Sequence, residues 1–246
     1  MRPTGRVLRS KVLWAGARVG VPLALVLIIA GGAVALAAHR KVTRSDAHAV
    51  ATAINLVHSD VPTLKAHLNT LTARDRQANA QLAGCIGENP PGAGIADVRS
   101  PDFDGPSPMS LTVDSETEIL PSSAAVAKDL AAIRRPHALT CLRTAYTAAL
   151  RESLPKTDTT TSSIARFSPP VASGTDASFG IRIIVDVHAK TATTTVTVPL
   201  YVDAIAFAYG QAEVTLDLLS AVTAPSPQLE AQLAKLLVAR ARRAIG

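Results

Sequence analysis

Three consecutive segments in the C-terminal half alternate apolar and polar residues, and this pattern restricts the fold more than any other feature. Residues 179–187, 196–209 and 214–218 place apolar side chains at every second position. A period of two predicts β-strands with one buried face. The connections at 190–192 and 210–211 are too short for a helical crossover. We therefore expect an antiparallel meander.

Segments with a helical period surround this meander. Residues 72–84, 123–133, 139–150 and 226–245 carry apolar side chains three or four positions apart. Ser226, followed by proline, is a typical start for the last of them. Helices around one antiparallel sheet define an α+β domain, which is the fold class that we expect.

A further strand is expected at residues 109–119, where Asp114, Glu116 and Glu118 alternate with apolar residues. The two-residue period is typical of a half-exposed strand and places these three acids on the solvent side. The proline- and glycine-rich residues 87–108 are expected to form a long surface loop. Residues 155–163 are expected to be a polar connection before a short strand at 164–168.

Residues 19–38 contain no charged side chain, and as a helix they would span the ~30 Å hydrocarbon core of a bilayer. Five basic residues precede this segment and three follow it closely. The flanking charges favour a transmembrane anchor whose N-terminus is cytoplasmic. The alternative is a cleaved signal peptide, with small residues at 35–37 as the cleavage motif.

These observations predict four parts and a location at the cell membrane. We expect a cytoplasmic stub at 1–18, a single-pass anchor or signal sequence at 19–38, a juxtamembrane stalk at 39–60 and an extracytoplasmic domain at 61–246. The membrane lipid bilayer is the partner expected for residues 19–38.

The net charge of +6 would suit a nucleic-acid-binding protein, but its distribution does not. Eight of the 25 basic residues and none of the 19 acidic residues lie in residues 1–44. Residues 45–246 therefore hold 25 − 8 = 17 basic and 19 acidic side chains, a net charge of −2. A domain of this charge lacks the basic surface that nucleic acid requires, so no nucleic-acid partner is expected.

The chain has two cysteines, Cys85 and Cys141. An even pair in an exported chain predicts a disulfide bond, here between two expected helices. A redox or metal-binding pair is the alternative, but the spacing is not Cys-x-x-Cys and no histidine cluster accompanies either residue.

Few residues have the spacing of a catalytic or metal site. None of the six histidines forms a zinc-protease pair, and no nucleophile elbow, phosphate loop or dinucleotide motif is present. We expect no enzyme activity, cofactor or metal. One polar set on two neighbouring strands remains as a candidate ligand-binding site, although an exposed sheet face explains it as well: Asp186, His188, Tyr201 and Asp203.

Five stretches of the chain resemble one family: SLTVDSETEILPSSAAVAKDLAAI, HALTCLRTAYTAAL, SFGIRIIVDV, VPLYVDAIAFAYGQAEVTLDLLS and PSPQLEAQLAKLLVARA. They are similar to the extracellular sensor-domain superfamily of actinobacteria, which includes PknH-type kinase sensor domains and envelope lipoproteins. The resemblance covers residues 60–245 and implies a sheet with packed helices and a cleft for an unknown envelope ligand. It also implies that Cys85 and Cys141 form a disulfide.

The chain departs from this family in three respects. It has neither the fused kinase nor the additional cysteines of PknH-type sensors, and it has no lipidated cysteine. The resemblance therefore implies an anchored, non-enzymatic sensor-like domain that binds a small molecule, lipid or protein. The alternatives are an envelope hydrolase with an unrecognised active site and a structural or assembly factor of the cell envelope.

Overall fold

The computed structural model describes residues 39–246, except 69, 91, 108–109, 172–173 and 191–192. The described part forms an eight-stranded antiparallel sheet in the order β1-β3-β4-β8-β7-β6-β5, and β2 pairs with β4 beside this path. The strands are β1 Lys65–His67, β2 Ala96–Arg99, β3 Asp102–Asp104, β4 Thr112–Ile119, β5 Thr159–Phe167, β6 Ala177–Lys190, β7 Thr195–Tyr209 and β8 Ala212–Ala221.

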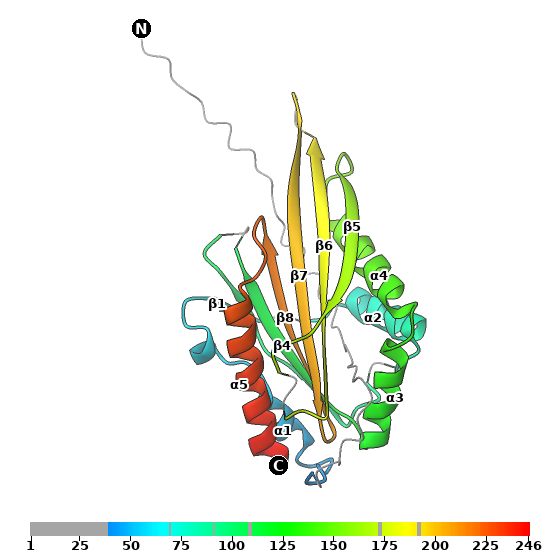
Figure 1. The fold of residues 1–246 in the computed structure, drawn as a ribbon, viewed down its shortest axis with the longest axis vertical. Helices are drawn as coiled ribbons and strands as arrows, with labels where there is room; N and C mark the ends of the chain where they lie inside the picture. Colours follow the sequence, from blue (N-terminus) through cyan, green and yellow to red (C-terminus); the bar gives the residue numbers. More distant parts are fainter. Residues whose placement is uncertain (1–38, 69, 91, 108–109, 172–173, 191–192) are drawn as a thin grey trace.

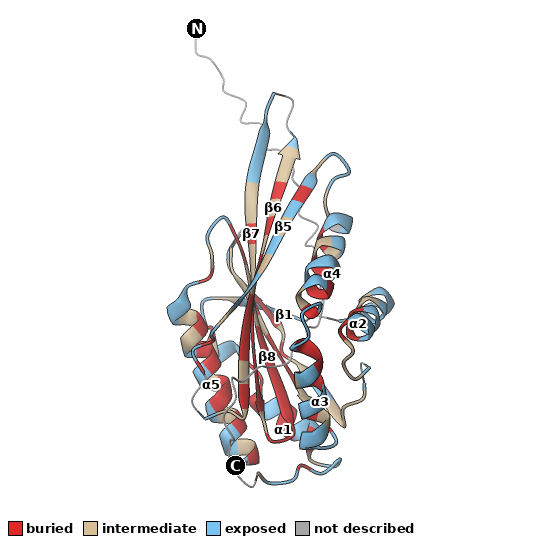
Figure 2. Ribbon diagram, turned by 45° about the vertical axis from the view of Figure 1, so that its right-hand side comes forward, coloured by how far each residue is buried: buried red, intermediate tan, exposed pale blue. Residues whose placement is uncertain are grey.

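Helices cover both faces of this sheet (Figures 1 and 2). One face, which we call the α5 face, is covered by α1 and α5, and the other, the α4 face, is covered by α2, α3 and α4. The helices are α1 Ala47–Ile54, α2 Ala73–Ile86, α3 Ser123–Ile133, α4 Ala138–Ser153 and α5 Pro227–Ile245, and a 3₁₀ turn forms at His58–Asp60. The expected α+β class is confirmed.

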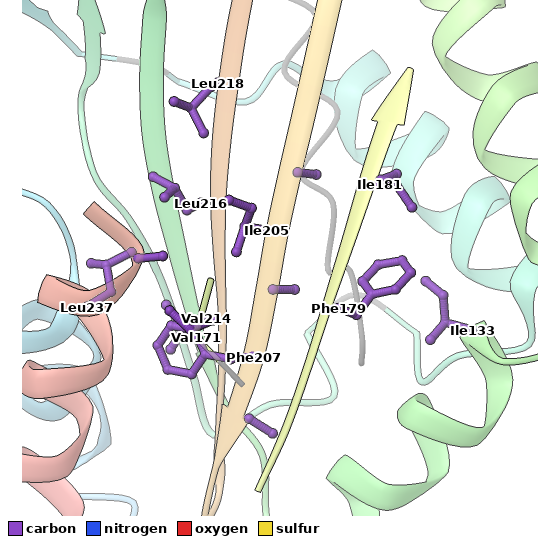
Figure 3. Close-up of a cluster of buried hydrophobic side chains, with 14 of the residues drawn as sticks. Ile133, Val171, Phe179, Ile181, Ile205, Phe207, Val214, Leu216, Leu218 and Leu237 are labelled. Atoms are coloured by element: carbon purple, nitrogen blue, oxygen red, sulfur yellow. The ribbon is translucent and has the colours of Figure 1, made fainter. Parts of the chain in front are cut away.

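Apolar side chains fill the space on both sides of the sheet (Figure 3). On the α5 face, Phe207 and Leu216 lie toward Leu237 of α5. On the α4 face, Phe179 lies toward Ile133 of α3. All five side chains are almost completely removed from water, which supplies the hydrophobic stabilisation of the domain.

Local signals in the sequence explain where α2 begins and ends. Thr72 caps α2, because its hydroxyl accepts from the backbone of Asp75 and the Asp75 carboxylate accepts from the backbone of Thr72. Gly87 ends α2 with φ +86°, a left-handed conformation that glycine adopts without strain. The chain then turns sharply and brings Glu88 back toward the sheet.

The expected meander is confirmed by the register of β6, β7 and β8, with Ala204 opposite both Ile181 and Asp217. Two expected loops are partly wrong. Residues 155–163 contain the first half of β5, because β-branched threonines suit a strand that pairs with β6. Residues 87–108 contain β2 and β3, since both find a partner in β4.

Residues 39–60 are part of the folded domain and do not form the expected stalk. Ala47, Ala51 and Ile54 of α1 are fully buried between α5 and strands β2 and β4. The backbone N–H of Arg40 donates to the carbonyl of Ile245 at 2.9 Å. The apolar side of α1 is therefore used for packing, and the domain begins by residue 39.

The predicted disulfide is confirmed: Cys85 near the end of α2 is bonded to Cys141 of α4. In the described part of the chain, no helix has the length and apolar character needed to cross a membrane. The predicted stub at 1–18 and anchor at 19–38 lie outside the described residues.

Candidate functional site: an acidic face under the helices

Buried oxygens without a hydrogen-bond partner gather on one side of the sheet. Among the described residues, the buried side-chain oxygens without a partner all belong to the α4 face or to the segments that cover it. Native proteins satisfy nearly all buried polar atoms, so a group of exceptions in one place requires an explanation. These oxygens are Asn79 Oδ1, Glu88 Oε1, Asp114 Oδ1, Asp217 Oδ1 and both Oε atoms of Glu213.

The register of β4 and β8 places like charges directly opposite each other. Asp114 pairs with Asp217, and Glu118 pairs with Glu213. Directly opposite side chains lie on the same face of a sheet, with Cβ atoms about 5 Å apart, and like charges in this arrangement destabilise the pairing. The two carboxyl pairs therefore lower the stability of the strand pair that carries them.

The first pair lies beneath the loop after α2. Glu213 is only 5% exposed, and burial raises its pKa well above the usual range, as do the charges of Asp129, Glu118 and Glu88. Burial raises the pKa of Glu88 to about 9, and the negative charges of Asp129 and Glu118 contribute to this increase. Burial and nearby Asp97 raise the pKa of Glu118 to about 7. Glu213 and Glu88 therefore hold protons at neutral pH unless a cation replaces them, whereas Glu118 titrates near neutral pH.

The hydrogen bonds around this first pair come from its edges. The backbone N–H of Gly94 donates to Glu118 at 2.9 Å. Asn89 donates to both oxygens of Asp129, at 2.7 and 2.9 Å. Glu213 receives no hydrogen bond from these groups, so its carboxyl group points into the cluster without a partner.

The second pair lies near α4. Burial raises the pKa of Asp114 to about 6, against the opposing effect of Arg99. Burial and the neighbouring Asp114 raise the pKa of Asp217 well above its usual range. Tyr146 of α4 is 7% exposed, and burial together with these two carboxyl groups raises the pKa of its hydroxyl. The phenol is therefore protonated beside the pair.

The space between the two pairs is electrically neutral. Glu116 lies between Asp114 and Glu118 on β4, and Arg99 of β2 donates to its Oε2 from Nε at 3.2 Å and from Nη2 at 2.8 Å. Thr215 lies opposite Glu116 on β8. The guanidinium thus neutralises the middle carboxylate, and its charge also acts on Asp114 and Asp217 of the second pair.

Small side chains lie beside the acids on the next strand. Asp217, Thr215 and Glu213 of β8 have β7 partners that are all alanines. These are Ala204, Ala206 and Ala208, which are fully buried. The α4 face therefore changes within one strand from carboxyl groups to a short apolar surface.

The carboxyl groups do not converge as metal ligands do. In the part of the chain that the structure describes, no group of three or more His, Cys, Asp or Glu side chains is arranged to hold a metal ion. The acids are spread along two strands, and this arrangement suits an extended ligand better than a point charge.

The candidate residues predicted from sequence lie on the opposite, α5 face. Asp203 is fully buried and accepts from Arg182 Nε and Nη2, both at 2.6 Å. Glu230 of α5 approaches the same guanidinium at 3.4 Å. Asp203 thus holds α5 against the sheet through Arg182.

Asp186, His188 and Tyr201 share this face of β6 and β7, as predicted, and are partly exposed. The two ring nitrogens of His188 lie 3.4 Å from the hydroxyl of Thr161 and 3.0 Å from that of Thr197. His188 pairs with Thr197, six positions along β7 from Asp203, so roughly 20 Å separate the ends of the set. The four residues are not brought together at one point, and their role in ligand binding stays a prediction.

The acidic face was missed because its residues were expected in water. Asp114 and Glu118 alternate with apolar residues as they would on an exposed face, and only the helices of residues 73–153 show that this face is covered. One signal was available. Acids at every second position of a strand are uncommon, because Asp and Glu are depleted in strands, and 213 and 217 repeat the pattern at the spacing of 114 and 118.

Comparisons with known proteins add little to this picture. No protein-family model matches the chain. No curated protein is significantly similar to it in sequence. Among solved structures, the chain is similar to the extracellular domain of PknH from Mycobacterium tuberculosis, with 11% sequence identity and a TM-score of 0.40. The match covers 83% of this chain and 99% of that domain. A similarity at this level does not establish a shared ligand or activity, and the family relationship stays a prediction.

Proposed function

We propose that the chain is a membrane-anchored, non-enzymatic, sensor-like protein whose domain lies outside the cell membrane and binds an envelope ligand on its α4 face. The observation that carries the proposal is the concentration of unpartnered buried oxygens on that face. Proteins keep such costly arrangements at binding sites, where a ligand supplies the missing partners.

The disulfide supports the extracytoplasmic location. Cys85 and Cys141 are bonded, and disulfides persist in oxidising compartments outside the cytoplasm. The bond also ties α2 to α4, and Glu88 follows α2 by two residues. The bond therefore holds together two of the helices that cover the acidic face.

Native mass spectrometry of the full-length chain, extracted from its own host with mild detergent, tests ligand binding. We expect a bound species that disappears in Glu213→Gln and in Asp217→Asn. The matched control is Glu152→Gln, an exposed position of α4 that should keep the species. A chain that is empty in every preparation contradicts the proposal.

The membrane anchor and the compartment are tested on the same preparation. Peptides that precede Arg40 should be recovered from the membrane fraction, and an N-terminus near residue 38 would indicate cleavage instead. Alkylation without reduction should label neither Cys85 nor Cys141 in the exported chain.

The carboxyl pairs also favour a second candidate function, an acid–base hydrolase. Such enzymes use one protonated and one ionised carboxyl group side by side, and Asp114 and Asp217 are opposite each other on neighbouring strands. Release of soluble sugars or peptides from host envelope by the wild-type chain, abolished in Asp217→Asn, would establish this function. Release that persists in the variant would exclude this pair as its source.

A further inference from the structure

We propose that the edge strand β5 binds an extended acidic segment of a partner protein, which adds a strand to the sheet along the outer side of β5. The inference goes beyond the ligand proposed for the acidic face, because it concerns a different surface. Two independent observations carry it: β5 is a sheet edge without the usual protection, and a row of exposed cations follows it.

The strand β5 forms one edge of the sheet (Figure 1), and in the described part of the chain no strand pairs with its outer side. All nine residues of Thr159–Phe167 pair with β6 in an unbroken register, so the strand has no bulge. It contains no proline and no lysine. Such an edge presents a row of unpaired backbone N–H and C=O groups, which proteins usually shorten, charge or cover.

The opposite edge of the sheet shows this usual protection. The strand β1 has only three residues, and Lys65 and His67 are two of them. On the α5 face, β5 instead presents Thr159, Thr161 and Ser163, which are small, uncharged and exposed. The outer side of β5 is therefore open to a further strand over a much greater length than that of β1.

Basic side chains outnumber acidic ones beside the open edge. Residues 134–167 hold six basic and two acidic side chains, and all six basic side chains are exposed. One of the two acids, Glu152, is paired with Arg74 of α2. The net charge of −2 for residues 45–246 therefore conceals a local excess of positive charge along β5.

Contacts between α4 and β5 place two of these cations along the strand. The hydroxyl of Thr147 donates to the hydroxyl of Ser162 at 2.9 Å. Arg151, one turn further along α4, donates from Nε to the hydroxyl of Thr160 at 3.1 Å. Arg143 lies one turn before Thr147, and residues four apart share one side of a helix. Both arginines are therefore on the side of α4 that faces β5.

A third cation lies at the other end of the strand. Arg166 is on the same face of β5 as Thr160, and its Nη2 donates to the carbonyl of Ile133 at 3.0 Å. At ~3.4 Å per residue, Arg166 lies about 20 Å along the strand from Thr160, which Arg151 contacts. We call Arg143, Arg151 and Arg166 the cation row, and it follows most of the length of the edge.

An extended acidic peptide complements both features. Its backbone would pair with the open N–H and C=O groups of β5, as in other cases of strand addition. Its side chains would alternate between the two faces, so acids at every second position would lie on the α4 face beside the cation row. Arginine forms strong charge-assisted hydrogen bonds with carboxylates. A polyanion without peptide groups would meet the cations but leave the backbone of β5 unpaired.

The probe is a peptide of alternating Glu and Thr, about ten residues long, titrated into the full-length chain in mild detergent. We expect Arg143→Gln and Arg151→Gln each to weaken binding about threefold or more. Arg243→Gln removes an exposed cation of α5 and should leave the affinity unchanged. The same peptide methylated at every backbone nitrogen should bind about tenfold more weakly or less, because it cannot donate to β5.

Hydrogen exchange locates the bound peptide. We expect exchange to slow in residues 159–167 and to stay unchanged in β1. Circular dichroism verifies that the variants, all at exposed positions, keep the fold.

Three results would overturn the inference. Equal affinities in Arg143→Gln and Arg243→Gln would mean that the peptide is attracted by charge alone. Unchanged binding of the methylated peptide would mean that the backbone of β5 takes no part. Tighter binding of polyphosphate or DNA than of the peptide, lost in Arg143→Gln, would assign the cation row to a different class of polyanion.

The result is separable from the proposed function. Glu213→Gln alters the acidic face and should bind the peptide as the wild type does. A chain that carries no ligand on the acidic face but binds the peptide through β5 contradicts only the proposed function, and the reverse outcome contradicts only this inference.

Discussion

On the α5 face of the sheet, Asp203 and Glu230 share the guanidinium of Arg182, whereas on the α4 face Glu213 has no hydrogen-bond donor at either carboxyl oxygen. The three acids are comparably buried, at 0%, 4% and 5% exposed. The two faces therefore differ in whether a buried carboxyl group has a hydrogen-bond donor, and not in how deeply it is buried.

The difference shows that the two faces meet different requirements. The α5 face satisfies its buried polar groups within the chain, as in the contacts of Asn55 with Ser115, Thr117 and the carbonyl of Val98. These bonds hold the end of α1 on the sheet, and Arg240 of α5 donates to the carbonyl of Asn55 at 2.7 Å. The α4 face leaves carboxyl groups unsatisfied at a cost in stability, which is expected of a surface that receives its partners from a ligand.

The α4 face is expected to respond to pH more strongly than the α5 face, where burial and Asp203 raise the pKa of Glu230 to about 7. The pKa values of Asp114, Glu118 and Glu88 are raised to about 6, 7 and 9. Above pH 4.5 the folded chain holds protons that the unfolded chain has lost, so unfolding releases protons. Their stabilising contribution is complete below the unfolded pKa and is lost as pH rises through the folded values, at about 1.4 kcal/mol per pH unit for each proton.

Urea unfolding between pH 5 and pH 9 measures this effect. We expect the free energy of unfolding to fall by several kcal/mol over the range, and Glu88→Gln to flatten the upper part of the curve. A free energy that is constant or rises with pH would show that these carboxyl groups are ionised in the folded chain.

Removal of the shared cation of the α5 face should have the next largest effect. Arg182→Met leaves Asp203 and Glu230 buried without a counter-charge, and such losses cost about 3–5 kcal/mol. Chemical denaturation at pH 7 measures the change. A loss below about 1 kcal/mol would mean that this cation does not hold α5 on the sheet.

The helices of the α4 face should depend on their disulfide. Cys85 and Cys141 are 56 residues apart, and the double serine variant is expected to lose about 2–4 kcal/mol through the greater entropy of its unfolded chain. Hydrogen exchange should rise in α2 before it rises in α5. Uniform exchange in both helices would contradict the idea that the bond serves mainly the α4 face.

The smallest expected effect is a gain in stability, whereas the preceding variants are expected to lose stability. Glu213→Gln removes a buried carboxyl group from repulsion and is expected to raise the stability of the ligand-free chain by about 1–2 kcal/mol at pH 8. Asp203→Asn, its counterpart on the α5 face, should lower stability because it weakens the two hydrogen bonds from Arg182. Thermal unfolding of both variants compares the faces directly, and a change of the same sign in both would remove the distinction.

The sequence predicts the elements whose signals are local. The alternation in 179–187 and 196–209 predicts β6 and β7, and Ser226 with Pro227 predicts the start of α5. The disulfide follows from the cysteine count and the expected export. These features depend on neighbours in sequence or on a pair with one possible connection.

The features that the sequence does not predict depend on contacts between residues far apart in the chain. Alternation shows that Glu118 and Val113 face opposite sides of β4, but it does not show that helices cover both sides. Likewise, no local pattern shows that Asp203 meets Arg182 and Glu230, because the three residues come from different elements. The acidic face is therefore visible only after the fold is known.

The contacts of the first described residues have a mechanical consequence. Arg40 is bonded to the end of α5, and the N–H of Val42 donates to Gln211 at the start of β8. Residue 39 is thus joined to the sheet and to the last helix with no compliant spacer. If residues 19–38 cross a membrane as expected, the domain is attached to the crossing segment at residue 39, whose side chain is held by its contact with Asp176 at 3.0 Å.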